Sequence, residues 1–208
     1  MRFIFIFMLF AIPLPLLAQV MPYSGGMAEL PFKRKDIWVA PDRLFSIEMP
    51  STWTAIAYDK KHDVTVLKPT NESVDANLVI QRLVVPAGAS PRQLLLNAIE
   101  QRLSKLPSFQ KIADRDVIVS GSPAAIVSGK YYYQGNAQFP RIIEELHIVK
   151  GTEAFILHFE CYAELAGYLG PDLEGFYNSF TIRPSNNRVK SNRHQLFPQE
   201  LDTDQIPF

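Results

Sequence analysis

The sequence is poor in cysteine. Its 208 residues include one, Cys161, so the chain cannot form an internal disulfide and must draw its stability from a hydrophobic core. Cys161 alternates in phase with Phe155, Leu157 and Phe159, which is the pattern of one face of a strand. Free cysteine is among the most buried residue types. We therefore expect a buried, unreactive thiol at this position.

Net charge and catalytic motifs are also lacking. The 21 Lys and Arg residues are balanced by 21 Asp and Glu residues. Binding to a nucleic-acid backbone requires clustered basic residues, so this balance argues against a nucleic-acid partner. The chain has no G-x-S-x-G elbow, no phosphate-binding loop, no G-x-G-x-x-G and no cysteine pair. These absences predict a protein that is not an enzyme and uses no cofactor.

Long apolar runs are absent except at the start, in MRFIFIFMLFAIPLPLLAQ. Arg2 precedes ten apolar residues, two prolines interrupt the run, and Ala18 is a small residue before a cleavage point. A membrane-spanning helix needs about 20 apolar residues. We interpret residues 1–18 as a cleaved secretory signal peptide rather than an anchor. The mature chain would then have no transmembrane segment and would be periplasmic or secreted, or lumenal in a photosynthetic organism.

Composition divides the remaining chain into three parts. Residues 19–40 are rich in Pro, Gly and Met and are interpreted as a linker or arm. Residues 185–208 are polar and lack periodicity, which predicts a disordered tail. One folded domain is predicted between them, over residues 41–184.

Strands are predicted on both sides of a central helix. In RLFSIEMPSTWTAI, Phe45, Ile47 and Met49 alternate with polar residues, Pro50 ends the run, and Trp53 begins the next strand. Because a period of two describes a half-buried strand, we expect the three alternating side chains and Trp53 in the core. Further strands are predicted within residues 64–69, 77–86, 116–135 and 141–163.

Two helices are predicted. Ser90 is suited to cap the first helix, Pro91 to its first position, and Gln93 to complete a capping box. The buried stripe that follows at helical spacing consists of Leu95, Leu96, Ile99, Leu103 and Leu106. Pro107 would end this helix, and Pro171 would open the second. The shared side of the second helix carries Leu173, Phe176, Tyr177 and Phe180.

Gly151 and Thr152 predict a two-residue turn in a hairpin. The resulting register pairs Glu145 with His158 and gives the hairpin one mostly apolar face. Most links between predicted strands are too short for parallel crossovers. The sequence therefore predicts an α+β fold, a mainly antiparallel sheet flanked by helices.

The other face of this hairpin carries Glu145, His147, His158 and Glu160. Two imidazoles and a carboxylate can bind zinc or transfer protons, so Glu145, His147 and His158 form a candidate metal site. The alternative is an ordinary cross-strand Glu–His pair worth at most about 1 kcal/mol. We favour that alternative and expect no metal.

Tyr131, Tyr132 and Tyr133 are consecutive, and in a strand Tyr131 and Tyr133 face the same way. Exposed tyrosines make good contact residues, so these two are the candidate binding residues. Ordinary strand packing is the alternative, and we favour it, because tyrosine is common in strands.

Several short motifs resemble those of the PsbP/DcrB-like proteins. Phe45, Ile47, Pro50 and Trp53 match the opening pattern F-x-I-x-x-P followed by Trp, and LEGFYNSFTI resembles the closing helix that runs into a Ser-Phe pair. Thr52 departs from the pattern, which commonly has Gly before the Trp. The resemblance covers about residues 41–183.

The resemblance implies a PsbP-like α/β/α sandwich without implying one activity. Members look like accessory or binding proteins of exported compartments, with a nuclear Ran-binding relative. We therefore expect an exported, non-enzymatic accessory or binding protein of the cell envelope, whose partner is a protein or an envelope component. The alternative is a metal- or small-ligand-binding protein, or an enzyme, that uses the Glu145, His147 and His158 face.

Overall fold

The computed structural model describes residues 35–183. The predicted signal peptide (1–18), residues 19–34 of the predicted arm and the predicted tail (185–208) lie outside the described residues. The strands are β1 (Lys35–Val39), β2 (Phe45–Pro50), β3 (Trp53–Asp59), β4 (Val64–Pro69), β5 (Ala76–Val84), β6 (Gln110–Val119), β7 (Ser122–Tyr132), β8 (Pro140–Lys150), β9 (Glu153–Tyr162) and β10 (Thr181–Ile182). The helices are α1 (Pro91–Gln101), α2 (Ala166–Ser179) and the 3₁₀ turns η1 (Leu103–Lys105), η2 (Tyr133–Gly135) and η3 (Ala163–Leu165).

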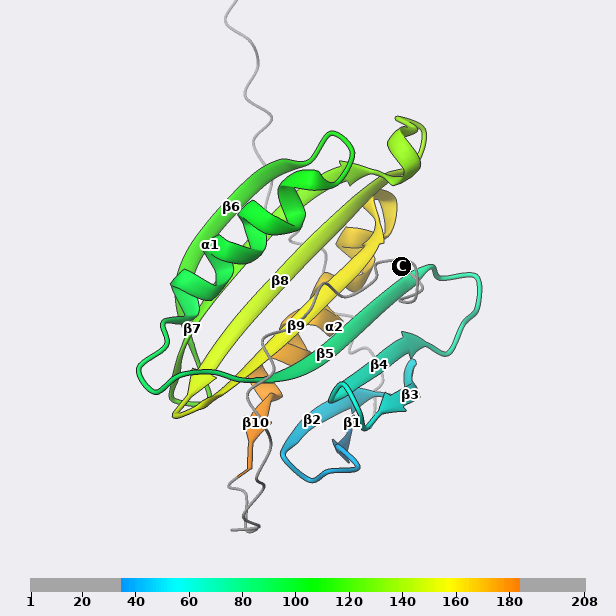
Figure 1. Ribbon diagram of the computed structural model, residues 1–208. Coiled ribbons are helices and arrows are strands. Elements are labelled where there is room, and N and C mark those ends of the chain that lie inside the picture. Colours follow the sequence, from blue (N-terminus) through cyan, green and yellow to red (C-terminus); the bar gives the residue numbers. More distant parts are fainter. Residues whose placement is uncertain (1–34, 184–208) are drawn as a thin grey trace, which may run out of the picture. The chain divides into compact units, whose positions relative to one another are not determined.

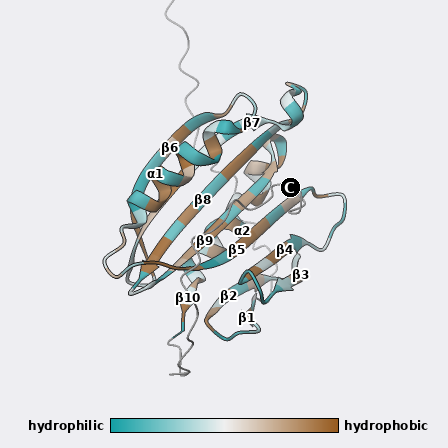
Figure 2. Ribbon diagram, in the orientation of Figure 1, coloured by the Kyte–Doolittle hydropathy of each residue, from teal (hydrophilic) through white to brown (hydrophobic). Residues whose placement is uncertain are grey.

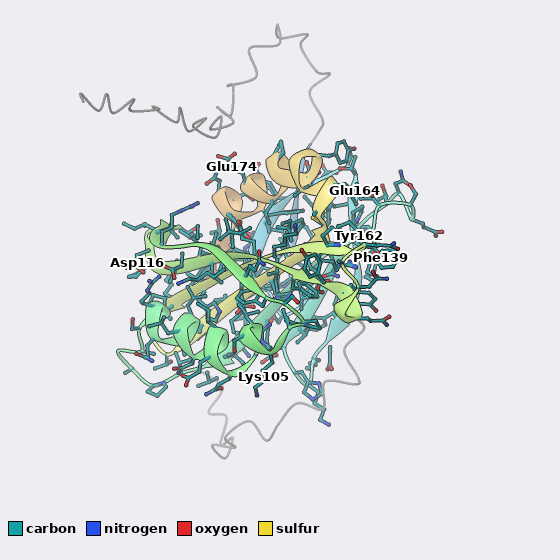
Figure 3. The ribbon with its side chains drawn as sticks, turned by 90° about the horizontal axis from the view of Figure 1, so that it is seen from above. Lys105, Asp116, Phe139, Tyr162, Glu164 and Glu174 are labelled. Atoms are coloured by element: carbon teal, nitrogen blue, oxygen red, sulfur yellow. The ribbon has the colours of Figure 1, made fainter. Side chains whose placement is uncertain are left out.

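Hydrogen bonding orders the described strands into two antiparallel sheets (Figure 1). The larger sheet has the order β3-β4-β5-β9-β8-β7-β6, and the smaller has the order β1-β2-β10. α1 lies against β7 and β8, whereas α2 lies on the opposite side against β2 and β9 (Figures 1 and 3). We call these two sides of the larger sheet the α1 face and the α2 face. The arrangement confirms the predicted α+β fold with a mainly antiparallel sheet.

The α2 face carries the main hydrophobic core. Phe155, Leu157 and Phe159 of β9 project into it, together with the apolar residues of β2 and α2. Phe45 stacks on Phe180 at 5.2 Å between ring centroids, so the smaller sheet and α2 are bound into one apolar cluster. The expected burial of Phe45, Ile47, Met49 and Trp53 is confirmed. Cys161 is buried at the end of this face, and burial raises the pKa of its thiol to about 12.

The α1 face has a smaller apolar cluster under the helix. Leu95 and Leu103 pack against Ala125, Val127 and Ile143 of the sheet. Gly129 of β7 allows the ring of Phe109 to lie directly on this face. A Cβ atom at position 129 would come within 2.4 Å of that ring, so a larger residue would push it away.

Both helices form, but several predicted details are wrong. α1 ends at Gln101, before a separate 3₁₀ turn, rather than at Pro107, and Leu96 of the expected buried stripe is 42% exposed. The Ser90 side chain accepts a hydrogen bond from the Gln93 backbone N–H at 3.4 Å. The Gln93 side chain donates instead to Asn97, so the reciprocal half of the capping box is missing. α2 begins at Ala166, directly after η3, and Pro171 lies inside it. Pro171 therefore removes one backbone hydrogen bond from the helix rather than starting it.

Two strands lie where none was predicted. β1 falls within the expected arm, and β10 follows α2; both pair with β2. β1 is a short strand whose residues 36–39 are exposed or half-buried, so its sequence shows only a weak apolar pattern. Among residues 35–183, neither helix has the length and apolar character needed to cross a membrane.

Candidate functional site

The predicted polar residues of the β8–β9 hairpin do meet on the α1 face. The turn at Gly151 and Thr152 forms, and the register pairs Glu145 with His158 as predicted. Figure 2 shows hydrophobic and hydrophilic bands along β8, so neither face of this strand is uniform in hydropathy. Strand periodicity thus places Glu145, His147, His158 and Glu160 on one side of the sheet.

Glu145 is the centre of a closed hydrogen-bonded group. Its Oε1 lies 2.6 Å from Nε2 of His147, and its Oε2 lies 2.8 Å from Nδ1 of His158. The guanidinium of Arg102, just past the end of α1, also donates to Oε2. Glu145 is 0% exposed, and both imidazoles are buried. We call Arg102, Glu145, His147 and His158 the Glu145 cluster.

The protonation of this cluster follows from its contacts. Burial alone would raise the pKa of Glu145, but hydrogen bonds from His147 and His158 and the charge of Arg102 outweigh it and hold that pKa well below its usual range. Burial would lower the pKa of His158, but its contacts with Glu145 and Glu160 raise that pKa above the usual value. Both shifts favour the charged forms, which are an ionised carboxylate on Glu145 and an imidazolium on His158.

A second group, buried except for Asp75, continues along the same face. Tyr131 donates to Oε1 of Glu160 at 2.5 Å, and Nε of Arg141 lies 2.6 Å from the same oxygen. The two Nη atoms of Arg141 contact Asp75 at 3.0 and 3.1 Å. Nε2 of His158 lies 3.9 Å from Oε2 of Glu160, which links the two groups electrostatically. We call Asp75, Tyr131, Arg141 and Glu160 the Arg141 cluster.

The structure buries Tyr131, as the favoured alternative of ordinary strand packing expects, and so does not offer it as an exposed contact residue. The Tyr131 side chain is 4% exposed, and its hydroxyl donates a hydrogen bond to Glu160. Tyr131 therefore cannot contact a partner. Burial is the main cause that raises the pKa of Tyr131 above its usual value. Tyr133 does not share its side of a strand, because β7 ends at Tyr132 and Tyr133 begins η2. Tyr133 is half-buried and lies over Arg141, with 5.4 Å between the guanidinium carbon and the ring centroid.

The geometry also bears on the candidate metal site. Residues 35–183 contain no group of three or more His, Cys, Asp and Glu side chains that is arranged to hold a metal ion. Both oxygens of Glu145 face imidazole nitrogens directly, and the cation Arg102 occupies the remaining approach to Oε2. A metal ion would have to displace Arg102 or separate these partners, because like charges repel at this range.

Sequence reasoning missed Arg102, Arg141 and Asp75. Arg102 lies just past the last turn of α1. The apolar stripe of the helix therefore does not by itself predict which way the Arg102 side chain points. Arg141 shares the face of Glu145 by strand alternation, which was a usable signal once the register was known. Asp75 lies outside the strands and could not be placed without the fold.

Two hollows of the described surface lie away from these clusters. One pocket of about 380 Å³ lies beside β6 and the start of α1, and a smaller one of about 60 Å³ lies near Trp53 and Asp172. Neither is lined by a member of the Glu145 cluster. Neither of these two hollows would therefore bring a bound molecule to the Glu145 cluster.

Two antiparallel sheets flanked by helices define the PsbP/Mog1-like α+β sandwich, the fold that the sequence resemblance implied. Similar solved structures include LpqN of Mycobacterium tuberculosis, which is involved in cell envelope biogenesis, at 15% identity over 73% of this chain and 91% of that one, with a TM-score of 0.55. CyanoP, the cyanobacterial PsbP of Synechocystis, has 9% identity over 77% and 99%, with a TM-score of 0.54. The yeast Ran-binding protein Mog1p has 6% identity over 72% and 96%, with a TM-score of 0.50.

No family model matches the chain, and no curated protein matches its sequence. At these identities, the three similarities show the fold alone. What the proteins bind does not follow from it.

Proposed function

We propose that this protein is an exported accessory protein of the cell envelope that works by binding a protein or an envelope component rather than by catalysis. The observation that carries this proposal is the closure of the Glu145 cluster. Its carboxylate is fully buried and already bonded to two imidazoles and a guanidinium. A catalytic acid or base must reach the proton that it transfers, and this one is occupied by neighbouring side chains.

The comparisons support the same proposal. LpqN is involved in cell envelope biogenesis, and Mog1p is a Ran-binding protein, so this fold serves envelope and protein-binding roles elsewhere. The predicted signal peptide over residues 1–18 adds export. N-terminal sequencing of the protein from an exporting host tests this part, with a mature chain starting near Gln19 expected and an intact Met1 contradicting it.

Chemical cross-linking in cells, followed by envelope fractionation and mass spectrometry, tests the binding role. Wild type and Glu145→Gln, compared where both are folded, should capture the same specific partner, because binding does not require the buried carboxylate. The proposal fails if no partner is recovered and a hydrolase screen finds a turnover that Glu145→Gln abolishes.

A second candidate function is binding of a metal or small ligand by Glu145, His147 and His158. One observation favours it: Nδ1 of His147 is buried and has no hydrogen-bond partner within residues 35–183. Buried polar atoms normally have a partner, so this nitrogen could accept one. The position of Arg102 on Glu145 opposes this candidate, and the zinc experiment described below separates the two.

A further inference from the structure

β6 presents free backbone groups at the edge of the larger sheet. β7 is its only partner among the described strands, and the turn between them is Ser120–Gly121. Both turn residues have positive φ, as in a two-residue type I′ hairpin. The residues that flank such a turn form a hydrogen-bonded pair, and pairs alternate along an antiparallel ladder. The backbone N–H and C=O groups of Ile118 and Asp116 therefore point away from β7.

The free part of this edge is regular. A register shift between Lys111 and Ala113 disturbs the first part of β6, which leaves residues 114–119 in an unbroken ladder with β7. Bulges of this kind protect edges from unwanted pairing. The opposite edge strand, β3, is interrupted in its middle, between Ala55 and Ala57. We call residues 114–119 the β6 edge.

An apolar anchor point lies beside the β6 edge. The side chain of Ile118 is 78% exposed. It borders the pocket of about 380 Å³, whose walls include Pro91 at the start of α1 and Pro123 of β7. Pockets that hold small ligands begin at about 300 Å³, so this one can accept a single large apolar side chain. A free edge and a pocket for a side chain are the two elements of recognition by strand addition.

The charges of the β6 edge select among possible partners. Asp114 is bound by Arg92 at 2.8 Å and by Lys111 at 2.5 Å, so its charge is compensated. Asp116, two residues later on the same side of the strand, makes no ion pair with any residue between 35 and 183. It lies at the margin of the domain, far from Phe139 and Tyr162 (Figure 3). Arg92, which is already bonded to Asp114, is close enough to attract Asp116 but makes no ion pair with it, so the Asp116 carboxylate still favours a basic side chain on the incoming strand.

We infer that the β6 edge binds an extended segment of a partner protein, with an apolar side chain at Ile118 and a Lys or Arg at Asp116. The two residues of the incoming segment that lie opposite Ile118 and Asp116 are two positions apart in its sequence and point to the same face. In the antiparallel orientation the segment reads apolar–x–basic. This inference rests on the proposed binding function and adds the site and the chemical class of the partner segment.

A second copy of the chain is disfavoured at this edge in the register centred on Arg115. Antiparallel self-pairing centred on the middle of β6 places Arg115 opposite Arg115 of the other copy and Asp114 opposite Asp116. Like charges directly opposed across strands are destabilising. Because a second copy could still pair with the β6 edge, the test must also detect self-association.

The test selects a phage-displayed library of random decapeptides on the whole protein and measures affinities of the enriched peptides. We expect enrichment of alternating sequences that contain apolar–x–Lys or apolar–x–Arg. Ile118→Pro should weaken binding at least tenfold, because it removes an outward backbone donor and the apolar contact. Proline is tolerated on an edge strand when its missing N–H faces away from the sheet, so the fold survives. Ile56→Pro on the opposite edge strand is the matched control and should leave affinity unchanged.

A charge swap sharpens the result. Replacing the peptide's basic residue by Glu should weaken binding about two- to fivefold, the range for an exposed ion pair. Asp116→Lys should reverse that preference. Enrichment of unrelated sequences, or binding that Ile118→Pro leaves intact, overturns the inference. A dimer in analytical ultracentrifugation that Ile118→Pro dissociates also overturns it, in favour of a second copy.

The outcome also separates this inference from the proposed function. If cross-linking recovers an envelope partner whose capture Ile118→Pro does not change, the binding function stands and the β6 edge is wrong. If no partner is recovered and a catalytic turnover is found instead, the proposed function itself fails.

Discussion

The two faces of the β8–β9 hairpin are built by the same twenty-one residues of strand, yet they are stabilised in different ways. On the α2 face, Leu146, Leu157 and Phe159 pack into a continuous apolar core. On the α1 face, Glu145, His147 and His158 form a hydrogen-bonded charged group beside a smaller apolar cluster. Hydrophobic packing is a sum of many small contacts. A buried charged group depends on every partner being present.

This difference predicts how each face responds to a single change. An apolar core loses free energy in proportion to the atoms removed and the cavity left. The Glu145 cluster loses more than one interaction at once, because one carboxylate serves three partners. Its net contribution is smaller than the number of contacts suggests, since burying the charges is itself unfavourable.

The largest effect is expected on the α2 face. Phe176 is fully buried and meets the ring of Trp53 edge-on at 5.0 Å. Phe176→Ala should lower the free energy of unfolding by about 3–5 kcal/mol, measured by urea denaturation. Tyr168→Ala on the same helix is the control; this side chain is 65% exposed, and the change should stay within about 0.5 kcal/mol. A loss below about 1 kcal/mol for Phe176→Ala would mean that the α2 face is not the main source of stability.

The next largest effect is expected on the α1 face. Glu145→Gln keeps the shape of the side chain but removes its charge, so it weakens hydrogen bonds to His158 and Arg102. Hydrogen bonds to charged groups contribute about 1.5–3 kcal/mol, and we expect a loss of that size in urea denaturation. Glu174→Gln, an exposed site on α2, is the matched control and should be neutral. Equal stability of Glu145→Gln and wild type would show that the cluster contributes nothing.

The two faces also differ in what the sequence could predict. Alternation in RLFSIEMPSTWTAI and the turn at Gly151 and Thr152 were sufficient for the core strands and the hairpin register, because both signals are local. The pairing of Glu145 with His158 followed from that register. The role of Arg102 depended on how α1 lies across the sheet, and the burial of Tyr131 depended on Arg141 and Glu160 beside it. These contacts join distant segments, so no local pattern records them.

A third prediction concerns pH and separates the faces, since both histidines of the β8–β9 hairpin lie on the α1 face. The pKa of Glu145 is lowered from its usual 4.5, so its contribution is present above pH 4.5 and is lost as the pH falls through the folded-state pKa. The pKa of His158 is raised from 6.5, so its contribution is present below pH 6.5 and is lost as the pH rises through the folded-state pKa. Stability should therefore be greatest between about pH 4.5 and 6.5.

Chemical unfolding at a series of pH values measures this dependence. One titrating group changes the free energy of unfolding by at most about 1.4 kcal/mol per pH unit. The groups that face His158 are Glu145, Glu160 and, through Glu145, Arg102. His158→Gln should flatten the alkaline side, whereas His62→Gln, an exposed histidine, should not. An alkaline decline that persists unchanged in His158→Gln would assign the dependence to other groups.

The smallest expected effect is that of zinc. If Arg102 holds Oε2 of Glu145, the cluster is complete without a metal, and added zinc should leave the thermal midpoint unchanged from that in a chelator. Binding of a ligand to the folded state alone must raise the midpoint. A rise with zinc that is kept in His62→Ala but lost in His147→Ala/His158→Ala would establish the metal-binding alternative. Arg102→Gln sharpens the test further, because removing this cation is the change most apt to open Glu145 to a metal ion. If zinc stabilises Arg102→Gln but not the wild type, the guanidinium is what keeps the α1 face closed.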